Sequence, residues 1–296
     1  MRSPSLVIAC IASVGCSRSP EPDSRPAVKP APTIAIDAGT IPAVVDAKRF
    51  ADLATALGAT IPADARVIGF GELHSRTDRA DVRSSLARFT TDALPGLAAK
   101  LSDLVVETWV VDQTCGKQAA EATAKVEISM RRPPATHNEI AELAAKARAA
   151  KIQPLAMTIT CADYKQVAPA GGEVDLEAML TLTTRELARQ IDEAVTKRDA
   201  EPGHRPWIAV YGGALHNDRF PGPGVEDWSY AVKADAVAKG HFVEIDLIVP
   251  ELAELDPASQ KQPWFPLVIK AATDVAVWQR GERSFVIVLA RGVKPT

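Results

Sequence analysis

The sequence predicts an α/β fold with a mostly parallel central sheet flanked by helices. Short apolar runs alternate along the chain with amphipathic stretches of helical length. Several of these runs are continuously apolar, as expected for strands buried on both faces of a parallel sheet. Strand–helix–strand alternation of this kind indicates helices that cover both faces of one sheet.

Six apolar runs are predicted as strands. The third run contains Pro154, which cannot donate a ladder hydrogen bond, so that strand is expected at an edge of the sheet or shortened. The six runs are Arg66–Gly71, Asp103–Thr108, Ile152–Met157, Trp207–Gly212, His241–Val249 and Ser284–Ala290.

Helices are predicted before and between these strands. Two of them end at a helix-stopping glycine, and another opens with a capping box formed by Thr136 and Glu139. Asp78 is predicted to cap a helix that runs to about Thr90. The remaining predicted helices are Asp46–Gly58, Thr136–Lys151, Asp175–Asp199 (one helix or a pair) and Asp227–Gly240.

The first 16 residues are typical of a targeting segment. Arg2 precedes the apolar run Leu6–Val14, which is too short to span a bilayer as a mature helix. Cys16 follows Ser-Val-Gly, which resembles a bacterial lipobox, so we expect lipidation at Cys16 and a membrane anchor through that lipid. An ordinary secretory signal with cleavage nearby is the alternative. Either reading predicts export to the bacterial cell envelope.

The rest of the chain divides into a tether and one domain. Residues 17–42 are rich in proline and predict a flexible linker, and residues 43–296 predict a single α/β domain. The net charge of −3 argues against a nucleic-acid partner. Only Cys115 and Cys161 remain beyond the targeting segment, and an exported protein most simply pairs them in a disulfide. A thiolate pair on a metal is the alternative.

Polar residues follow three of the predicted strands. Glu72 and His74 follow the first, Glu107 ends the second, and His216 follows the fourth. In a parallel sheet the carboxyl ends of the strands lie on one rim, where ligands bind. Each residue alone has a structural explanation, such as a helix cap or an ion pair, but together they predict one site.

The same spacing, G-x-x-H, occurs twice in this set, at Gly71–His74 and at Gly213–His216. We expect each glycine to let the chain turn sharply at the strand end, so that the histidine points back over the sheet.

Two mechanisms fit these residue types. In one, Glu72, His74, Glu107 and His216 are candidate ligands of a divalent metal, zinc, manganese or cobalt, which activates water. In the other, a Glu–His dyad acts as general base without a metal. Arg76 or Arg219 is the candidate donor to a developing oxyanion. The aromatic residues Trp109, Tyr211, Trp228 and Tyr230 are candidates for a pocket wall.

Two G-x-x-H motifs with an intervening glutamate resemble the superfamily of erythromycin esterase, ChaN, TraB and Tiki proteins. The motifs span about Gly69–Asn217, and the lipoprotein-like N-terminus is most similar to the ChaN type. The resemblance implies hydrolysis of ester or peptide bonds, in some members metal-dependent, or haem binding. It assigns the site to Glu72, His74, Glu107 and His216. The stretch Ser75–Arg83 holds no second histidine, unlike many ChaN-like chains, which disfavours haem.

The leading expectation is therefore an envelope lipoprotein that hydrolyses a small-molecule or peptide substrate at a Glu/His site. The alternative is a ChaN-like lipoprotein that binds haem or another iron ligand without turnover, and a third reading is a site that has lost activity. The sequence contains no G-x-S-x-G, H-E-x-x-H or P-loop motif, which argues against a serine hydrolase, a zincin and a P-loop NTPase.

Overall fold

The computed structural model describes residues 47–111, 113–130, 132–169, 172–201 and 203–292. The predicted signal segment, the lipidation at Cys16 and the tether of residues 17–42 lie outside the described residues. Contacts divide the chain into Met1–Thr40 and Ile41–Thr296, and all described residues belong to the second unit. Within the described part of the chain, no helix is both long and apolar enough to cross a membrane.

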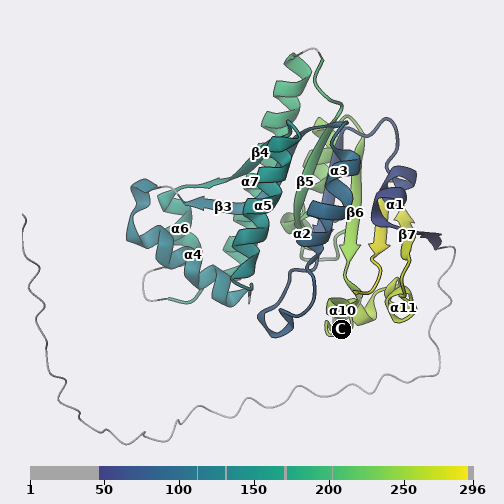
Figure 1. Ribbon diagram of the computed structural model, residues 1–296. Helices are drawn as coiled ribbons and strands as arrows, with labels where there is room; N and C mark the ends of the chain where they lie inside the picture. Colours follow the sequence, from purple (N-terminus) through teal and green to yellow (C-terminus); the bar gives the residue numbers. More distant parts are fainter. Residues whose placement is uncertain (1–46, 112, 131, 170–171, 202, 293–296) are drawn as a thin grey trace, which may run out of the picture. The chain divides into compact units, whose positions relative to one another are not determined.

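The described residues form an α/β fold around a mixed sheet of eight strands (Figure 1). The strand order is β1-β7-β8-β6-β2-β5-β3-β4. All neighbours from β8 to β4 pair in parallel, whereas β7 pairs antiparallel with both β1 and β8 at one edge. The predicted mostly parallel α/β fold is thus confirmed, with antiparallel pairs added. The strands are β1 Lys48–Phe50, β2 Val67–Glu72, β3 Leu101–Val111, β4 Gln153–Ile159, β5 Trp207–Gly213, β6 Phe242–Ile248, β7 Val275–Gly281 and β8 Ser284–Val288.

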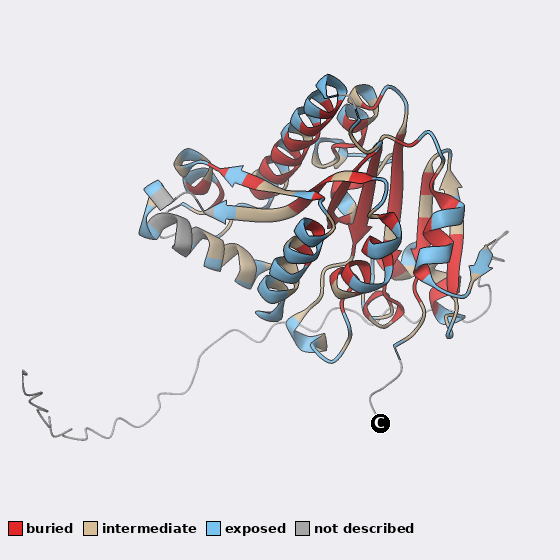
Figure 2. Cartoon of the chain, turned by 45° about the horizontal axis from the view of Figure 1, so that its top comes forward, coloured by how far each residue is buried: buried red, intermediate tan, exposed pale blue. Residues whose placement is uncertain are grey.

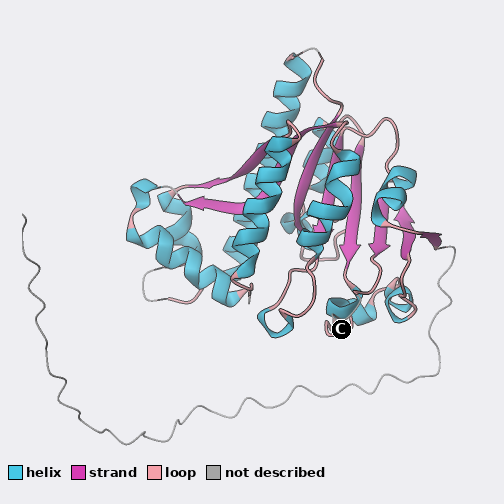
Figure 3. Cartoon of the chain, in the orientation of Figure 1, coloured by secondary structure: helices cyan, strands magenta, loops and turns pink. Residues whose placement is uncertain are grey.

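Helices lie on both faces of this sheet (Figure 3). The first half of the chain contains α1 Leu53–Thr60, α2 Ser85–Arg88, α3 Leu94–Leu97, α4 Lys117–Ser129, α5 Ala135–Ala149 and α6 Cys161–Val167. The second half contains α7 Leu176–Ala200, α8 Ala214–Asn217, α9 Ala231–Val237, α10 Pro250–Ala253 and α11 Phe265–Ile269. Short 3-10 turns lie at Thr77–Arg79, Gln113–Cys115, Glu226–Trp228 and Ser259–Lys261, and a π-helical turn lies at Phe89–Ala93.

The buried core has two main layers, one on each face of the sheet (Figure 2). Even-numbered β2 residues such as Ile68 and Phe70 pack with α1, α2, α3 and α5. Val67 and the β5 residues Ile208 and Val210 pack with α6, α7 and α9 on the other face. Side chains alternate between the faces along a strand, so both faces of the central strands are apolar, as their continuous apolar sequence predicted.

All six predicted strands are present, and the edge position expected from Pro154 is confirmed because β4 ends the sheet order. Two strands were missed. Strand β1 occupies the start of the predicted helix Asp46–Gly58, and the helix there begins only at Leu53, capped by Asp52. Strand β7 has a buried start and an exposed end, which is weaker than the signal of a strand buried on both faces.

Two predicted helix starts are wrong. Asp78 lies in a 3-10 turn with its carboxylate bonded to Arg76, and the helix begins at Ser85, capped by the Ser84 hydroxyl. Helix α5 begins at Ala135 without a side-chain cap, because Glu139 instead accepts a hydrogen bond from Ser84 at 2.7 Å. The first error replaces one local contact by another, and the second arises from a tertiary contact between Ser84 and Glu139.

Candidate functional site

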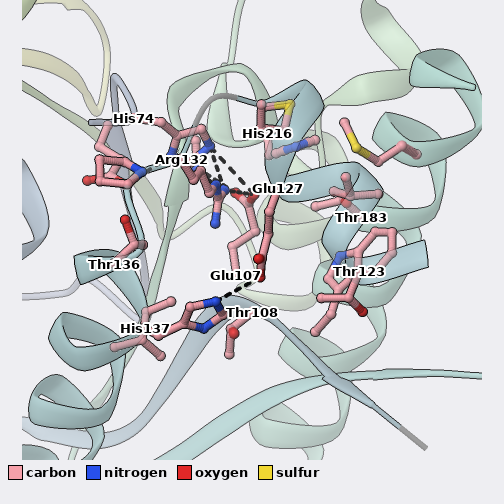
Figure 4. A pocket seen from close by; sticks show the side chains of 18 of the residues that line it. His74, Glu107, Thr108, Thr123, Glu127, Arg132, Thr136, His137, Thr183 and His216 are labelled. Carbon is pink, nitrogen blue, oxygen red and sulfur yellow. Dashed lines mark hydrogen bonds and ion pairs between the residues drawn. The ribbon is translucent and has the colours of Figure 1, made fainter. Parts of the chain in front are cut away.

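Three of the four predicted site residues lie at the carboxyl ends of strands, whereas Glu107 lies inside β3, which continues to Val111 beyond the strand end expected from the sequence. Glu72 is the last residue of the central strand β2, and it pairs in register with Gly213 at the end of β5. His74 follows two residues later, Glu107 lies in β3 on the other side of β5, and His216 lies in α8 directly after β5. Figure 4 shows His74, Glu107 and His216 around one cavity together with Arg132.

A bulge in β3 sets the direction of Glu107. The pairing of β3 with β4 runs to Val106, skips Glu107 and Thr108, and resumes at Trp109. Extra residues in one strand bend it and re-aim the side chains at the break. Glu107 thereby reaches over β5, where its Oε2 accepts a hydrogen bond from the Gly213 amide at 2.6 Å.

Arg132 connects Glu107 to His74. Its Nη2 lies 2.8 Å from Glu107 Oε1 and 2.8 Å from His74 Nε2. A guanidinium has five N–H donors. Among the described residues, its Nε and Nη1 atoms have no hydrogen-bond partner, so two positions of this cation are left for a ligand.

Glu72 fixes the other side of the His74 ring. Its Oε1 lies 2.9 Å from His74 Nδ1, and its Oε2 accepts a hydrogen bond from the Tyr211 hydroxyl at 2.5 Å. A guanidinium only donates, so the contact between Arg132 and His74 Nε2 requires a lone pair on that nitrogen. That contact corresponds to a neutral His74 with its proton on Nδ1, donated to Glu72, whereas a protonated ring would donate to both Glu72 and Glu107, whose Oε1 lies 3.6 Å from His74 Nε2.

His216 is held by different partners. Thr184 donates its hydroxyl to the Trp228 carbonyl at 2.7 Å, and both oxygens lie 2.9 Å from His216 Nδ1. Because that hydroxyl hydrogen is committed to the carbonyl, Nδ1 must be the donor and must carry the proton. Nε2 is then an unprotonated acceptor, and it has no hydrogen-bond partner within the described part of the chain.

Burial and charge set the protonation of these groups. Burial lowers the pKa of His216, and the nearby Glu107 only partly opposes this, so the ring stays neutral. Burial raises the pKa of Glu107, but hydrogen bonding to His74 and the charge of Arg132 outweigh it and hold that pKa well below its ordinary value. Burial and Arg132 lower the pKa of His74, yet bonds to Glu107 and Glu72 raise it overall.

The glycine of each G-x-x-H motif leaves space for a residue of the other motif. A Cβ on Gly71 would lie 2.7 Å from the Ala214 Cα, where α8 packs against β2. A Cβ on Gly213 would lie 3.0 Å from His74 Nε2. Neither glycine has a positive φ, so the expected sharp turn at each glycine is wrong, and close approach is the reason for them.

Gly212→Ala should therefore damage both stability and the site. The new Cβ would lie 2.6 Å from Glu107 Oε2 and 2.9 Å from Glu107 Cβ, so Glu107 must move. We expect a loss of about 1–3 kcal/mol in the free energy of unfolding, measured by urea denaturation. Gly58→Ala is the matched control, because its Cβ would meet nothing within 4 Å inside α1, and it should stabilise slightly. Equal effects of both changes on the free energy of unfolding would contradict the close approach of Glu107 as the reason for Gly212.

A buried carboxyl lies beside the His216 segment. Asn217 Nδ2 donates to Asp246 on β6 at 3.3 Å, while Asn217 Oδ1 has no partner in the described chain. Burial, and then repulsion from Glu244, raises the pKa of Asp246 well above its ordinary value. A proton on Asp246 would supply the donor that Asn217 Oδ1 lacks.

The raised pKa of Asp246 predicts the direction in which the free energy of unfolding changes with pH. The folded state holds this proton more tightly than the unfolded state, so its stabilising contribution is lost as the pH rises above the ordinary value of 3.8 through the raised pKa. Asp246→Asn should remove this part of the pH dependence. The free energy of unfolding of the variant, relative to that of the wild type, should therefore be higher at pH 8 than at pH 5. Urea unfolding at the two pH values measures it, and parallel wild-type and variant curves would contradict it.

The candidate site opens into a cavity of about 820 Å³. Residues of β3, α4, α5, α7 and α8 line it, so the α4–α5 segment covers the strand ends. A disulfide joins Cys115 and Cys161, with Cα atoms 5.2 Å apart, as predicted. It ties the turn before α4 to the start of α6, so one wall of the cavity is covalently anchored.

The predicted oxyanion donors are elsewhere. Arg76 is bonded to Asp78, and Arg219 to Asp235 and the Phe242 carbonyl, and neither lines the cavity. Among the described residues that line the cavity, the arginine is Arg132. Sequence reasoning missed it because it lies between two helices, before Pro133, with no strand or motif to mark it.

The four predicted aromatic residues have different positions. Trp109 lines the cavity, and Tyr211 supports Glu72. Trp228 contributes its backbone carbonyl to His216, while Tyr230 is buried in the core and does not line the cavity.

The predicted metal ligands are not arranged around a common point. Among the described residues, no group of three or more His, Cys, Asp or Glu side chains could hold a metal ion. Glu72 bonds Tyr211 and His74, and Arg132 Nη2 contacts both His74 Nε2 and Glu107 Oε1, which lie 3.6 Å apart. In this arrangement the guanidinium is the cation that His74 and Glu107 contact.

Comparisons with known proteins add little to this geometry. No protein-family model and no curated protein matches the chain. The solved structure of the type III effector HopBA1 is similar over 85% of this chain and 100% of its own, with a TM-score of 0.42 and 19% sequence identity. A likeness at this level carries no argument about function, which must rest on the site.

Proposed function

We propose that this chain is a hydrolase of carboxylic esters, or of related acyl bonds, that acts without a metal. The observation that carries the proposal is His216, a buried neutral imidazole whose Nδ1 is committed to Trp228 and Thr184 and whose Nε2 is unprotonated. An imidazole in this state is suited to act as a general base on a water molecule. We propose that it acts as an envelope lipoprotein, on the strength of the lipobox-like residues before Cys16.

Arg132 supplies the second requirement of acyl hydrolysis. A carbonyl oxygen gains negative charge as water attacks it, and a fixed donor aimed at that oxygen stabilises the transition state. The Nε and Nη1 atoms of Arg132 have no partner among the described residues and are suited to this role. Glu107 and His74 hold the guanidinium in place.

The carboxylates have supporting roles in this proposal. Glu107 has a pKa well below its ordinary value, so it is a poor base at neutral pH, and it positions Arg132 instead. Glu72 orients His74 with the help of Tyr211. This assignment replaces the Glu–His general-base dyad expected from the sequence with His216 alone as the base.

Hydrolysis of chromogenic p-nitrophenyl esters by the purified protein tests the proposal. We expect Arg132→Gln to lower kcat by about 100-fold, because it removes the donor to the oxyanion. Arg185→Gln is the control, since Arg185 is an exposed arginine paired with Asp163 outside the cavity. Equal activity of the two variants would contradict the role of Arg132.

Metal chelation separates this mechanism from the metal-dependent one. A metal bound by His74 and Glu107 would require Arg132 to leave its position between them. We therefore expect EDTA to leave ester hydrolysis unchanged and added zinc not to raise it. Activity that is lost with EDTA and restored by zinc would overturn the metal-free mechanism and restore the predicted ligand set.

One observation favours the haem-binding alternative as well. An imidazole nitrogen without a proton, in a largely apolar cavity, is also a typical axial ligand for haem iron. Haem titration decides it: a Soret band that is absent in His216→Ala, with no ester turnover by the wild type, would favour binding over catalysis.

A further inference from the structure

We infer that the substrate is an uncharged ester with a large apolar acyl or alcohol group, rather than a small polar ester or a charged peptide. The inference rests on the proposed function and names the substrate class of the same site. Three features of the cavity lead to it: the composition of its wall, the pairing of its charges and the character of its mouth.

Apolar side chains from β3, α4, α5 and α7 line the cavity, interspersed with threonines and with the pair Glu127 and His137. Trp109 of β3, Val126 of α4, Ile140 of α5 and Met179 and Leu180 of α7 line it. The site residues Glu107, Arg132 and His216 line the same cavity. A cavity of about 820 Å³ accommodates a drug-sized ligand, far more than an acetyl group needs. An apolar group in this space would be buried in contact with apolar side chains.

The charged side chains that line the cavity are already paired with one another. Glu72 bonds His74, Glu107 bonds Arg132, and Glu127 lies 2.9 Å from His137 where α4 faces α5. Away from Arg132, a charged group on the substrate would lose water and would have to compete with these existing contacts for a partner, which is costly. The part of the substrate remote from the scissile bond is therefore uncharged.

The mouth exposes apolar side chains. Ile128 on α4 is 76% exposed and Leu215 on α8 is 37% exposed, and both line the cavity. An apolar substrate entering from water would cover these side chains. A small polar ester would leave them in water.

Chain-length dependence tests the inference. We expect kcat/KM for p-nitrophenyl octanoate to exceed that for p-nitrophenyl acetate by at least ~30-fold, because the added methylenes are buried in the wall. Met179→Trp fills the cavity and should lower kcat/KM for the octanoate about 10-fold or more while changing the acetate less than about 2-fold. Leu176→Trp is the matched control, since Leu176 is exposed on the same helix outside the cavity.

A binding measurement separates this inference from the proposed function. The neutral dye Nile red should bind the wild-type protein, and 2-decanone, an unhydrolysable ketone analogue, should displace it. Binding should weaken in Met179→Trp and, should that variant not fold, in Val126→Phe. Dye binding without hydrolysis of any ester would overturn the hydrolase and leave the apolar ligand. Equal turnover of acetate and octanoate, unaffected by Met179→Trp or Val126→Phe, would overturn the apolar ligand and leave the hydrolase.

Discussion

His216→Gln should lower kcat for ester hydrolysis by about 10²–10⁴-fold, the contribution typical of a general base. The glutamine amide can still donate to the Trp228 carbonyl in place of His216 Nδ1, so the buried position keeps its hydrogen bond. It has no group that can take a proton from water at neutral pH. Because the substitution removes the base and not the cavity, KM should change little.

Two further variants make this result specific. His204 pairs with Glu201 outside the cavity. Because it does not touch the substrate, His204→Gln should leave kcat within about 2-fold of the wild-type value. Thr184→Val removes one of the two partners of His216 Nδ1 and should lower kcat about 10-fold, because the ring loses part of its orientation. Full activity in His216→Gln would show that another group acts as the base.

Replacing Cys115 and Cys161 with serine should destabilise the protein by about 4 kcal/mol. The crosslink closes a segment with a sequence separation of 46, and removing it returns the corresponding chain entropy to the unfolded state. The loss should appear in urea unfolding of the double variant, and in the wild type after reduction with dithiothreitol. Dithiothreitol should have no effect on the double variant.

The disulfide also has a consequence for the cavity. It joins the turn before α4 to α6, and α4 supplies Val126 and Glu127 to the cavity wall. We expect the reduced protein to lose activity toward the octanoate ester more than toward the acetate ester. An unchanged free energy of unfolding after reduction would show that packing alone holds α4 in place.

The fold could be predicted from the sequence because its strongest signals are local. The central strands are buried on both faces, so their apolar runs are continuous, and the glycine that follows α9 marks that helix end. The antiparallel edge was missed because Lys48–Phe50 is short and mostly exposed, and its pairing with β7 joins residues more than two hundred positions apart.

The candidate site was predicted in part for a similar reason. Glu72 ends β2, His74 and His216 follow β2 and β5, and Glu107 comes directly after the last residue of β3 that pairs with β5. A parallel sheet brings such positions to one rim. The roles of these residues depend on contacts that the sequence does not reveal. Arg132 comes from the α4–α5 connection, and the β3 bulge that aims Glu107 leaves no mark in the apolar pattern.

The glycines illustrate the same limit. In "VIGFGELH" and "YGGALH" the sequence indicated two similar motifs, and a turn was the simplest reason for their glycines. The structure gives a reciprocal reason, because Gly71 makes room for α8 and Gly213 makes room for His74. Such a relation between segments about 140 residues apart needs the three-dimensional arrangement.

The protonation state of His216 tests the central claim most directly, because it requires no knowledge of the substrate. Nitrogen-15 NMR of the histidine rings, assigned with His216→Gln, reports which ring nitrogen carries the proton and the pKa of each ring. We predict a neutral His216 at pH 7 with the proton on Nδ1 and a pKa below the ordinary value of 6.5. A His216 that is protonated on Nε2 at pH 7, in either the neutral or the charged form, would contradict its role as the base.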